Sequence, residues 1–243
     1  MQAFLRYALF AGAFCVCSAP AVAEVSLVDS LILAAPSADP KVIRLAVEAA
    51  SCASGQHQRA AQRLAVIDYS RPSTEPRLWV FDLTQRRLLY AELVAHGRNS
   101  GDNYARSFSN ASGSYESSLG LFRTRDPYDG HNGYSLRMDG LEAGVNDRAA
   151  ERAIVMHGAP YVNTKFLRTQ GRLGRSQGCP AVRPEVARSL IDALKGGQYV
   201  FSYYPDAKWL ASSTFLQCGT QRMAAPEGTI AAASVATISS NAP

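Results

Sequence analysis

The sequence has 243 residues, of which 47% are hydrophobic and 19% are charged, and it carries a formal net charge of +5. This length is sufficient for one domain with a substantial core and terminal extensions. The small positive charge is compatible with an anionic polymer as a partner, but Lys and Arg are scattered, and no long basic run stands beside an aromatic motif. The composition therefore argues against a nucleic-acid-binding protein.

Residues 1–23 have the pattern of a secretory signal peptide. Arg6 precedes an apolar run over residues 8–17, and residues 21–23 (Ala-Val-Ala) form a small-x-small cleavage site. The alternative, an uncleaved membrane anchor, is disfavoured because the run is too short for a convincing membrane span. No later stretch is able to cross a bilayer. We expect export to the periplasm or cell envelope. The mature chain would begin at Glu24, lack a transmembrane span and, without Arg6, have its charge reduced from +5 to +4.

The mature chain would keep three cysteines, Cys52, Cys179 and Cys218. An odd number in an oxidising compartment leaves at least one of them unpaired or bonded to another molecule. Cys52 lies near the end of a helical segment and Cys218 near the carboxy terminus. We hypothesise that these two form a disulfide that closes a long loop and leaves Cys179 reduced.

The first element of the mature chain is a helical amino-terminal extension, predicted over residues 24–63. Asp39 supplies an N-cap, and Pro40 stands at the first helical position. The apolar stripe of this helix consists of Val42, Leu45, Ala46 and Ala49. The segment is predicted to flank the domain that follows and to pack against it.

Short β-rich runs then predict a mostly β domain over residues 64–205. The run LAVIDYS is followed by RLWVFDL and RRLLYAELVAHG, and the last two form a predicted hairpin. Three further strands are predicted in LGLFRT, YSLRMDGL and RAIVMHGA, and QYVFSYYP is the closing strand. One short helix is predicted in PEVARSLIDALKGG, because proline lies near its start and glycines follow its end.

Two segments lack hydrophobic periodicity. Residues 98–118 are rich in Gly, Ser and Asn and predict a long surface loop. Long ordered loops inside a compact domain are often functional. Residues 206–243 end in an Ala/Ser/Thr tail, so we expect a carboxy-terminal extension that is largely disordered.

The segment GRLGRSQGCPAVRPE, residues 171–185, places Cys179 in a polar, glycine-rich and cationic setting. A cysteine nucleophile needs a base, a group that orients the base, and donors for the developing oxyanion. His157 ends a predicted strand, and the carbonyl of Gly158 is placed to accept the imidazole N–H and fix its tautomer. The N–H groups of Gly178 and Cys179 are candidate oxyanion donors, since glycine permits close approach of the backbone.

Two arginines flank this cysteine. Arg175 and Arg183 would favour its thiolate if their charges lie near the sulfur. The remaining histidines are less informative: His131 in a Gly/Asn-rich turn is a candidate substrate contact, whereas His96 is expected to have a structural role and His57 to be solvated.

These motifs resemble the L,D-transpeptidase catalytic domain, the YkuD-type family of murein enzymes. The resemblance is greatest to an exported branch whose cysteine segment reads GRxGRSxGCPA, and it covers residues 64–205. The stretches HGRNSGDNYARSFSN, SSLGLFRT and ERAIVMHG belong to the same pattern. The resemblance implies a β-sandwich or barrel-like domain with a short helix after the catalytic cysteine loop, and it implies no cofactor.

The resemblance also implies a reaction. The cysteine attacks the peptide carbonyl after an L-configured centre of a peptidoglycan stem peptide, the terminal D-residue leaves, and an amine acceptor takes the acyl group. Carried over, Cys179 is the nucleophile, His157 the base, and Gly158 the residue whose carbonyl orients that base. Ser176 and Gly178 are parts of the cysteine loop, with Ser176 as a substrate-binding candidate.

Three departures from the better-known members leave the attacked bond and the acceptor open. Gln177 stands where those members have His, and residues 180–182 delay Arg183, a candidate for binding a stem carboxylate through its fork geometry. The interval from His157 to Cys179 is also longer than in those members, and the segment YVNTKFLRTQGRLG within it is a candidate part of the substrate wall.

Three alternatives remain beside the transpeptidase. Water in place of the amine would give an L,D-carboxypeptidase or endopeptidase, and acceptor choice depends on how the pocket excludes water. A noncatalytic wall-binding module would not need Cys179. A zinc-dependent hydrolase is disfavoured because the sequence has no H-x-H or H-E-x-x-H motif. We therefore predict no metal, peptidoglycan stem peptides as partners, and a monomer.

Overall fold

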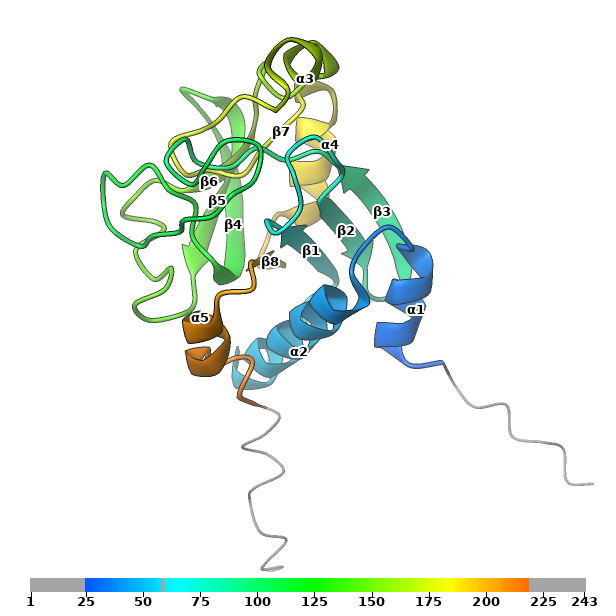
Figure 1. Cartoon of the computed structure of the whole chain (residues 1–243). Helices are drawn as coiled ribbons and strands as arrows, with labels where there is room; N and C mark the ends of the chain where they lie inside the picture. Colours follow the sequence, from blue (N-terminus) through cyan, green and yellow to red (C-terminus); the bar gives the residue numbers. More distant parts are fainter. Residues whose placement is uncertain (1–24, 58–59, 219–243) are drawn as a thin grey trace, which may run out of the picture.

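A computed structural model describes residues 25–57 and 60–218 of the chain (Figure 1). Its centre is an eight-stranded sheet in the order β3-β2-β1-β8-β4-β5-β6-β7, so the predicted mostly β class is confirmed. The strands are β1 Arg63–Asp68, β2 Leu78–Asp82, β3 Arg87–Glu92, β4 Gly120–Gly130, β5 Gly133–Gly140, β6 Val155–Gly158, β7 Ala181–Val182 and β8 Tyr199–Tyr203. The helices are α1 Leu27–Ala34, α2 Pro40–His57, α3 Thr164–Gln170, α4 Pro184–Leu194 and α5 Ala207–Ser212.

The middle of the sheet is buried on both faces. The runs LAVID of β1, LWVFD of β2 and YVFSY of β8 are buried at every position, as expected for strands covered on two sides. β2 and β3 form the predicted antiparallel hairpin. β1 and β8 pair in parallel, with Leu64 opposite Tyr199, although they lie at the two ends of the domain.

The sheet is bent so that it nearly closes. The edge strand β7 receives a hydrogen bond from the chain that leaves β3, because Ala95 N–H donates to Ala181 O at 2.8 Å. This contact brings the segment after β3 against the end of the sheet that carries β6 and β7. The result is a barrel-like arrangement whose closing seam lies beside the cysteine segment.

Helices cover both faces of the sheet (Figure 1). On one face, the side chains of Leu64 and Val66 share a core with α1, α2 and α5. On the other face, Ala65 and Ile67 share a core with α4. The alternation along β1 therefore assigns successive residues to two separate cores.

The amino-terminal helices were predicted correctly as helix. α2 begins at Pro40, and the Asp39 carboxylate accepts a hydrogen bond from Lys41 N–H at 2.8 Å. α2 packs on β1 and β8 as part of the main core. The hypothesised disulfide is confirmed: Cys52 of α2 is bonded to Cys218, with 166 residues of sequence separation.

The carboxy-terminal prediction needs correction for residues 206–218. Asp206 caps α5, and Trp209 is buried against Phe201 and Tyr203. This part is a packed element, since an aromatic side chain and a disulfide attach it to the core. The predicted signal peptide over residues 1–23 and the Ala/Ser/Thr tail lie outside the described residues.

The helix α3 was not predicted. It lies in the segment proposed as a substrate wall, where the Asn163 side chain accepts from Phe166 N–H and Gly171 ends the helix with φ of 64°. Both are common helix-terminal signals, but the helix is short and has no fully buried residue. Within the described part of the chain, no helix has both the length and the apolar composition to span a membrane.

Candidate active site

Cys179 and His157 open onto one cleft with a volume of about 520 Å³. The sheet explains their approach: β6 pairs in parallel with β7, and His157 lies opposite Ala181. Cys179 precedes Ala181 by two residues, so the end of β6 and the cysteine loop meet at the same place. The two residues that the sequence analysis separated by 22 positions are brought together by this short pairing.

The His157 imidazole is held in one tautomer. Its Nδ1 lies 2.9 Å from the carbonyl oxygen of Gly158, and because a carbonyl can only accept, Nδ1 carries the proton. The hydrogen bond expected at Gly158 is therefore present, and it leaves Nε2 as an acceptor. Desolvation lowers the pKa of His157, opposed in part by the Gly158 hydrogen bond. The neutral imidazole is the form suited to a base.

Cys179 is a free cysteine and only 8% exposed. Its sulfur accepts a hydrogen bond from Val155 N–H at 3.4 Å, and its thiol donates to Ala153 O at 3.7 Å. Desolvation raises the pKa of the thiol, opposed by the Val155 N–H and by the charge of Arg152. The resting cleft is thus lined by a neutral thiol and a neutral imidazole, because burial disfavours charge on both.

Arg152 is a site residue that the sequence analysis missed. Its guanidinium donates to Ser109 O, Ser118 Oγ, Ser114 Oγ and Glu116 O, at 2.6 to 3.1 Å. A Cβ added to Gly178 would lie 3.4 Å from Arg152 Nη2, so the guanidinium also packs against the cysteine loop. The run RAIVMHGA predicts a strand that starts at Arg152, whereas the strand begins at Val155, and Ala153 turns the chain with φ of 54°.

The cysteine loop is closed by its own hydrogen bonds. Ser176 Oγ donates to Cys179 O at 2.6 Å and accepts from Gly178 N–H at 3.1 Å. Gly178 has φ of 122°, and a Cβ there would lie 2.8 Å from Glu116 O. The absence of a side chain at Gly178 therefore lets its backbone pack closely against the loop of residues 98–118. The Ser176 hydroxyl shapes the loop, and because Ser176 also lines the cleft, its contact with substrate stays a prediction.

This arrangement corrects the expected oxyanion donors. Because Gly178 N–H is bonded to Ser176 Oγ, it is not free in this conformation. The Cys179 N–H has no hydrogen-bond acceptor among the described residues. Cys179 N–H is the candidate that remains.

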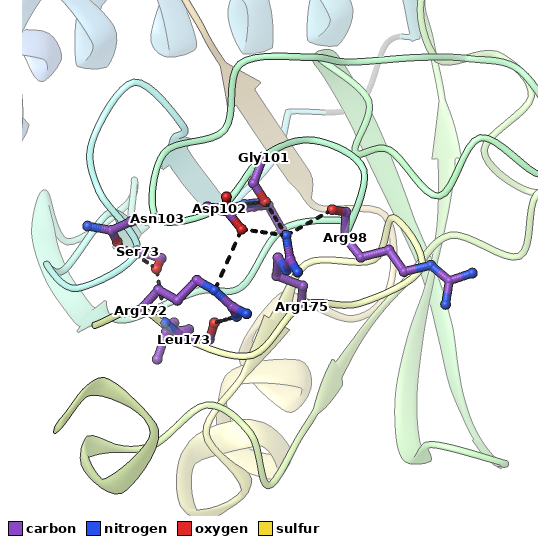
Figure 2. Close-up of polar contacts among 9 residues, drawn as sticks. Ser73, Arg98, Gly101, Asp102, Asn103, Arg172, Leu173 and Arg175 are labelled. Carbon is purple, nitrogen blue, oxygen red and sulfur yellow. Dashed lines mark hydrogen bonds and ion pairs between the residues drawn. The ribbon is translucent and has the colours of Figure 1, made fainter. Parts of the chain in front are cut away.

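Neither flanking arginine supplies the charge that lowers the pKa of the Cys179 thiol, which comes from Arg152. Arg183 forms a bidentate ion pair with Glu92 of β3, at 2.8 Å for both contacts, and it does not line the cleft. In this conformation the fork of Arg183 is occupied by Glu92 and is not free for the stem carboxylate predicted there. Arg175 lines the cleft, but its guanidinium bonds Asp102 at 2.9 Å and the carbonyl of Gly101 (Figure 2).

The two histidines of the loops have different settings. His131 is exposed at the tip of the β4–β5 hairpin and lines the cleft, which keeps it a candidate substrate contact. His96 is buried: its Nδ1 accepts from Arg77 Nη2 at 2.7 Å, and Nε2–H donates to Gly101 O at 3.2 Å. Burial and the nearby Arg77 charge lower the pKa of His96 to about 4. His96 therefore serves the fold.

The described residues offer no set of metal ligands. Among residues 25–57 and 60–218, no three His, Cys, Asp or Glu side chains are grouped so as to hold a metal ion. The chemistry that the cleft offers is that of a thiol, an oriented imidazole, a backbone N–H and three guanidinium groups from Arg98, Arg152 and Arg175.

Comparison with known proteins gives a family match over most of this fold. Residues 34–203, which include α2 and all eight strands, match the L,D-transpeptidase catalytic domain. No curated protein matches the sequence. The chain is similar to solved structures of an L,D-transpeptidase from Mycobacterium smegmatis (14% identity, 60% of each chain, TM-score 0.37) and the cell shape determining protein Pgp2 from Campylobacter jejuni in its K307A form (12% identity, 68% of this chain and 56% of that chain, TM-score 0.40). It spans about 60% of the length of the former.

Proposed function

Because the chain belongs to the family of L,D-transpeptidase catalytic domains, we propose that it is a peptidoglycan L,D-transpeptidase that uses Cys179 as its nucleophile. The observation that supports this most is that a cysteine outside the disulfide and an imidazole whose Nε2 is left as an acceptor line the same cleft. A nucleophile, a base and a group that orients the base are the parts that acyl transfer requires.

In the first half of the reaction, the Cys179 thiol leaves its contact with Ala153 O and gives its proton to His157 Nε2. The sulfur then bonds to the peptide carbonyl carbon after the L-configured centre of the donor stem. Cys179 N–H stabilises the oxyanion, and the Gly158 carbonyl stabilises the imidazolium through Nδ1–H. Collapse of this intermediate breaks the C–N bond, the departing amine of the D-residue takes the proton from His157, and a thioester remains.

The second half returns the enzyme to its starting state. An amine on another stem loses its proton to His157 Nε2 and bonds to the thioester carbon. The C–S bond then breaks, and the sulfur takes back the proton as a thiol. Water in the place of the amine would instead release the shortened acid, which is the hydrolytic outcome.

We also propose that the protein acts outside the cytoplasm. The disulfide between Cys52 and Cys218 supports this location, since such bonds persist in oxidising compartments and are rare in the cytosol. The amino-terminal signal-peptide pattern predicts the same compartment.

The test is mass spectrometry of purified muropeptides after incubation with the protein or with Cys179→Ala. We expect new crosslinked dimers with the unsubstituted protein and none with Cys179→Ala, because loss of the thiol removes the acyl-enzyme. Shortened monomers in place of dimers would assign hydrolysis. Unchanged muropeptides with both proteins would argue against the enzyme and favour a wall-binding module.

A further inference from the structure

The cleft is lined by three arginines, but two of them are already engaged. The Arg152 guanidinium makes four hydrogen bonds to the loop of residues 109–118. Arg175 pairs with Asp102, which also receives Arg172 at 3.8 Å (Figure 2). The acidic residue of the cleft, Glu151, pairs with Arg148 at 2.7 Å.

Arg98 is the exception among these cations. Its side chain is exposed, and in the described part of the chain no carboxylate pairs with it. Figure 2 shows this side chain pointing away from the Asp102–Arg175 cluster. Its guanidinium lies instead over the ring of Tyr115, 3.9 Å from the ring centroid. Stacking engages the face of the guanidinium and leaves its in-plane N–H donors available.

The backbone holds Arg98 at a fixed place relative to Cys179. Arg98 N–H donates to Ser176 O at 2.8 Å, and Arg98 O accepts from Arg175 Nη1 at 3.2 Å. Both partners belong to the cysteine loop, three and four residues before the nucleophile. The backbone from which the Arg98 side chain extends therefore cannot move without moving the cysteine loop.

The aromatic platform is equally constrained. Tyr115 has φ of 56°, in the left-handed region that a bulky residue seldom adopts. Its carbonyl accepts from Asn99 N–H at 3.2 Å and would lie 2.4 Å from a Cβ at position 97, where glycine permits the approach. A strained residue held in this way at a cleft is a common sign of a functional position.

We propose that Arg98, stacked on Tyr115, is the subsite that binds a carboxylate of the peptide acyl donor. The exposed Arg98 guanidinium lines the same cleft as Cys179, and its free N–H fork matches the planar geometry of a carboxylate. The inference rests on the proposed function, because it assigns the ligand to the same cleft. The carboxylate belongs either to the terminal D-residue that leaves or to the acyl half of the donor.

The experiment combines a substitution with a change in the substrate. Kinetics are measured for the unsubstituted protein, Arg98→Gln and Arg98→Lys on a stem peptide and on two analogues, one amidated at its terminal carboxylate and one at the carboxylates of its acyl half. Arg188→Gln is the matched control, because Arg188 is also exposed and lies 4.1 Å from the Tyr134 ring centroid, away from the cleft.

We expect Arg98→Gln to lose about 10- to 100-fold in kcat/KM on the unmodified peptide, mainly through KM, the range for a hydrogen bond to a charged group. Arg98→Lys should recover part of this loss, and Arg188→Gln should match the unsubstituted protein. One of the two amidations should slow the unsubstituted protein by a similar factor but leave Arg98→Gln unaffected. That analogue identifies the carboxylate.

A loss in Arg98→Gln that is the same for all three peptides would overturn the proposal, since it would show a structural role. No loss would overturn it as well. If the unsubstituted protein converts none of the peptides, the proposed function fails separately. Calorimetric binding of the same three peptides to Cys179→Ala, with and without Arg98→Gln, then decides the role of Arg98.

Discussion

The disulfide between Cys52 and Cys218 closes a long covalent loop, and the effect of its removal on the free energy of unfolding can be calculated. A cross-link stabilises mainly by restricting the unfolded chain, and the loss of entropy grows with the logarithm of loop length. For 166 residues of separation, that relation gives about 5 kcal/mol at 25 °C. The double variant Cys52→Ala/Cys218→Ala should therefore unfold at a much lower denaturant concentration.

The assay is equilibrium unfolding in urea, followed by circular dichroism and by tryptophan fluorescence. With a slope of about 2.5 kcal/mol per M for a chain of this size, we expect the midpoint to fall by about 2 M. The reduced, unsubstituted protein is the control, because it loses the bond but keeps both side chains. A midpoint that moves by less than about 0.5 M in both proteins would refute the reasoning. It would mean that residual structure in the unfolded chain already keeps its two ends close without the bond.

Two further predictions concern charge in the interior. Arg152→Gln should shift the pH profile of Cys179 alkylation to higher pH, because the cation that lowers the thiol pKa is lost. Arg152→Lys, the control, should keep the profile close to that of the unsubstituted protein. An unshifted profile in Arg152→Gln would contradict the assignment. His96 has a folded-state pKa of about 4 against an unfolded value of about 6.5. The unfolded state therefore binds more protons between these values, and the free energy of unfolding should fall by about 2.5 kcal/mol as pH decreases from 7 to 4.5. In His96→Gln that part of the pH dependence should disappear, as measured by urea unfolding at pH 7 and pH 4.5; an equal fall in both proteins would show that other groups cause it.

The predicted catalytic residues came from local signals. Cys179 and His157 were found because each stands beside glycines in a pattern that a nucleophile and an oriented base require. The Gly158 hydrogen bond followed from its position next to the base, since a neighbouring carbonyl is within reach of the ring. Local sequence is informative for this hydrogen bond because it joins adjacent residues.

Arg183 and Arg152 show where the same reasoning failed. Arg183 is close to Cys179 in sequence, but the intervening β7 directs its side chain to Glu92, 91 residues away along the chain. Arg152 is distant from Cys179 in sequence and close in space, because the turn at Ala153 brings it against Gly178. Which charge acts on a buried thiol depends on which segments of the protein pack around it.

By itself, the sequence determined the helices α1, α2 and α4, every strand except β7, and which cysteine stays outside the disulfide, but it did not reveal α3 or α5. Hydrophobic periodicity, capping residues and an odd cysteine count are properties of short stretches and of composition, so they can be interpreted before folding is known. Only the tertiary structure decided the parallel pairing of β1 with β8, the packing of α5, and the partners of each arginine in and around the cleft. The physical reason is that these contacts join residues far apart in the chain, and their geometry follows from how the two cores close on the sheet.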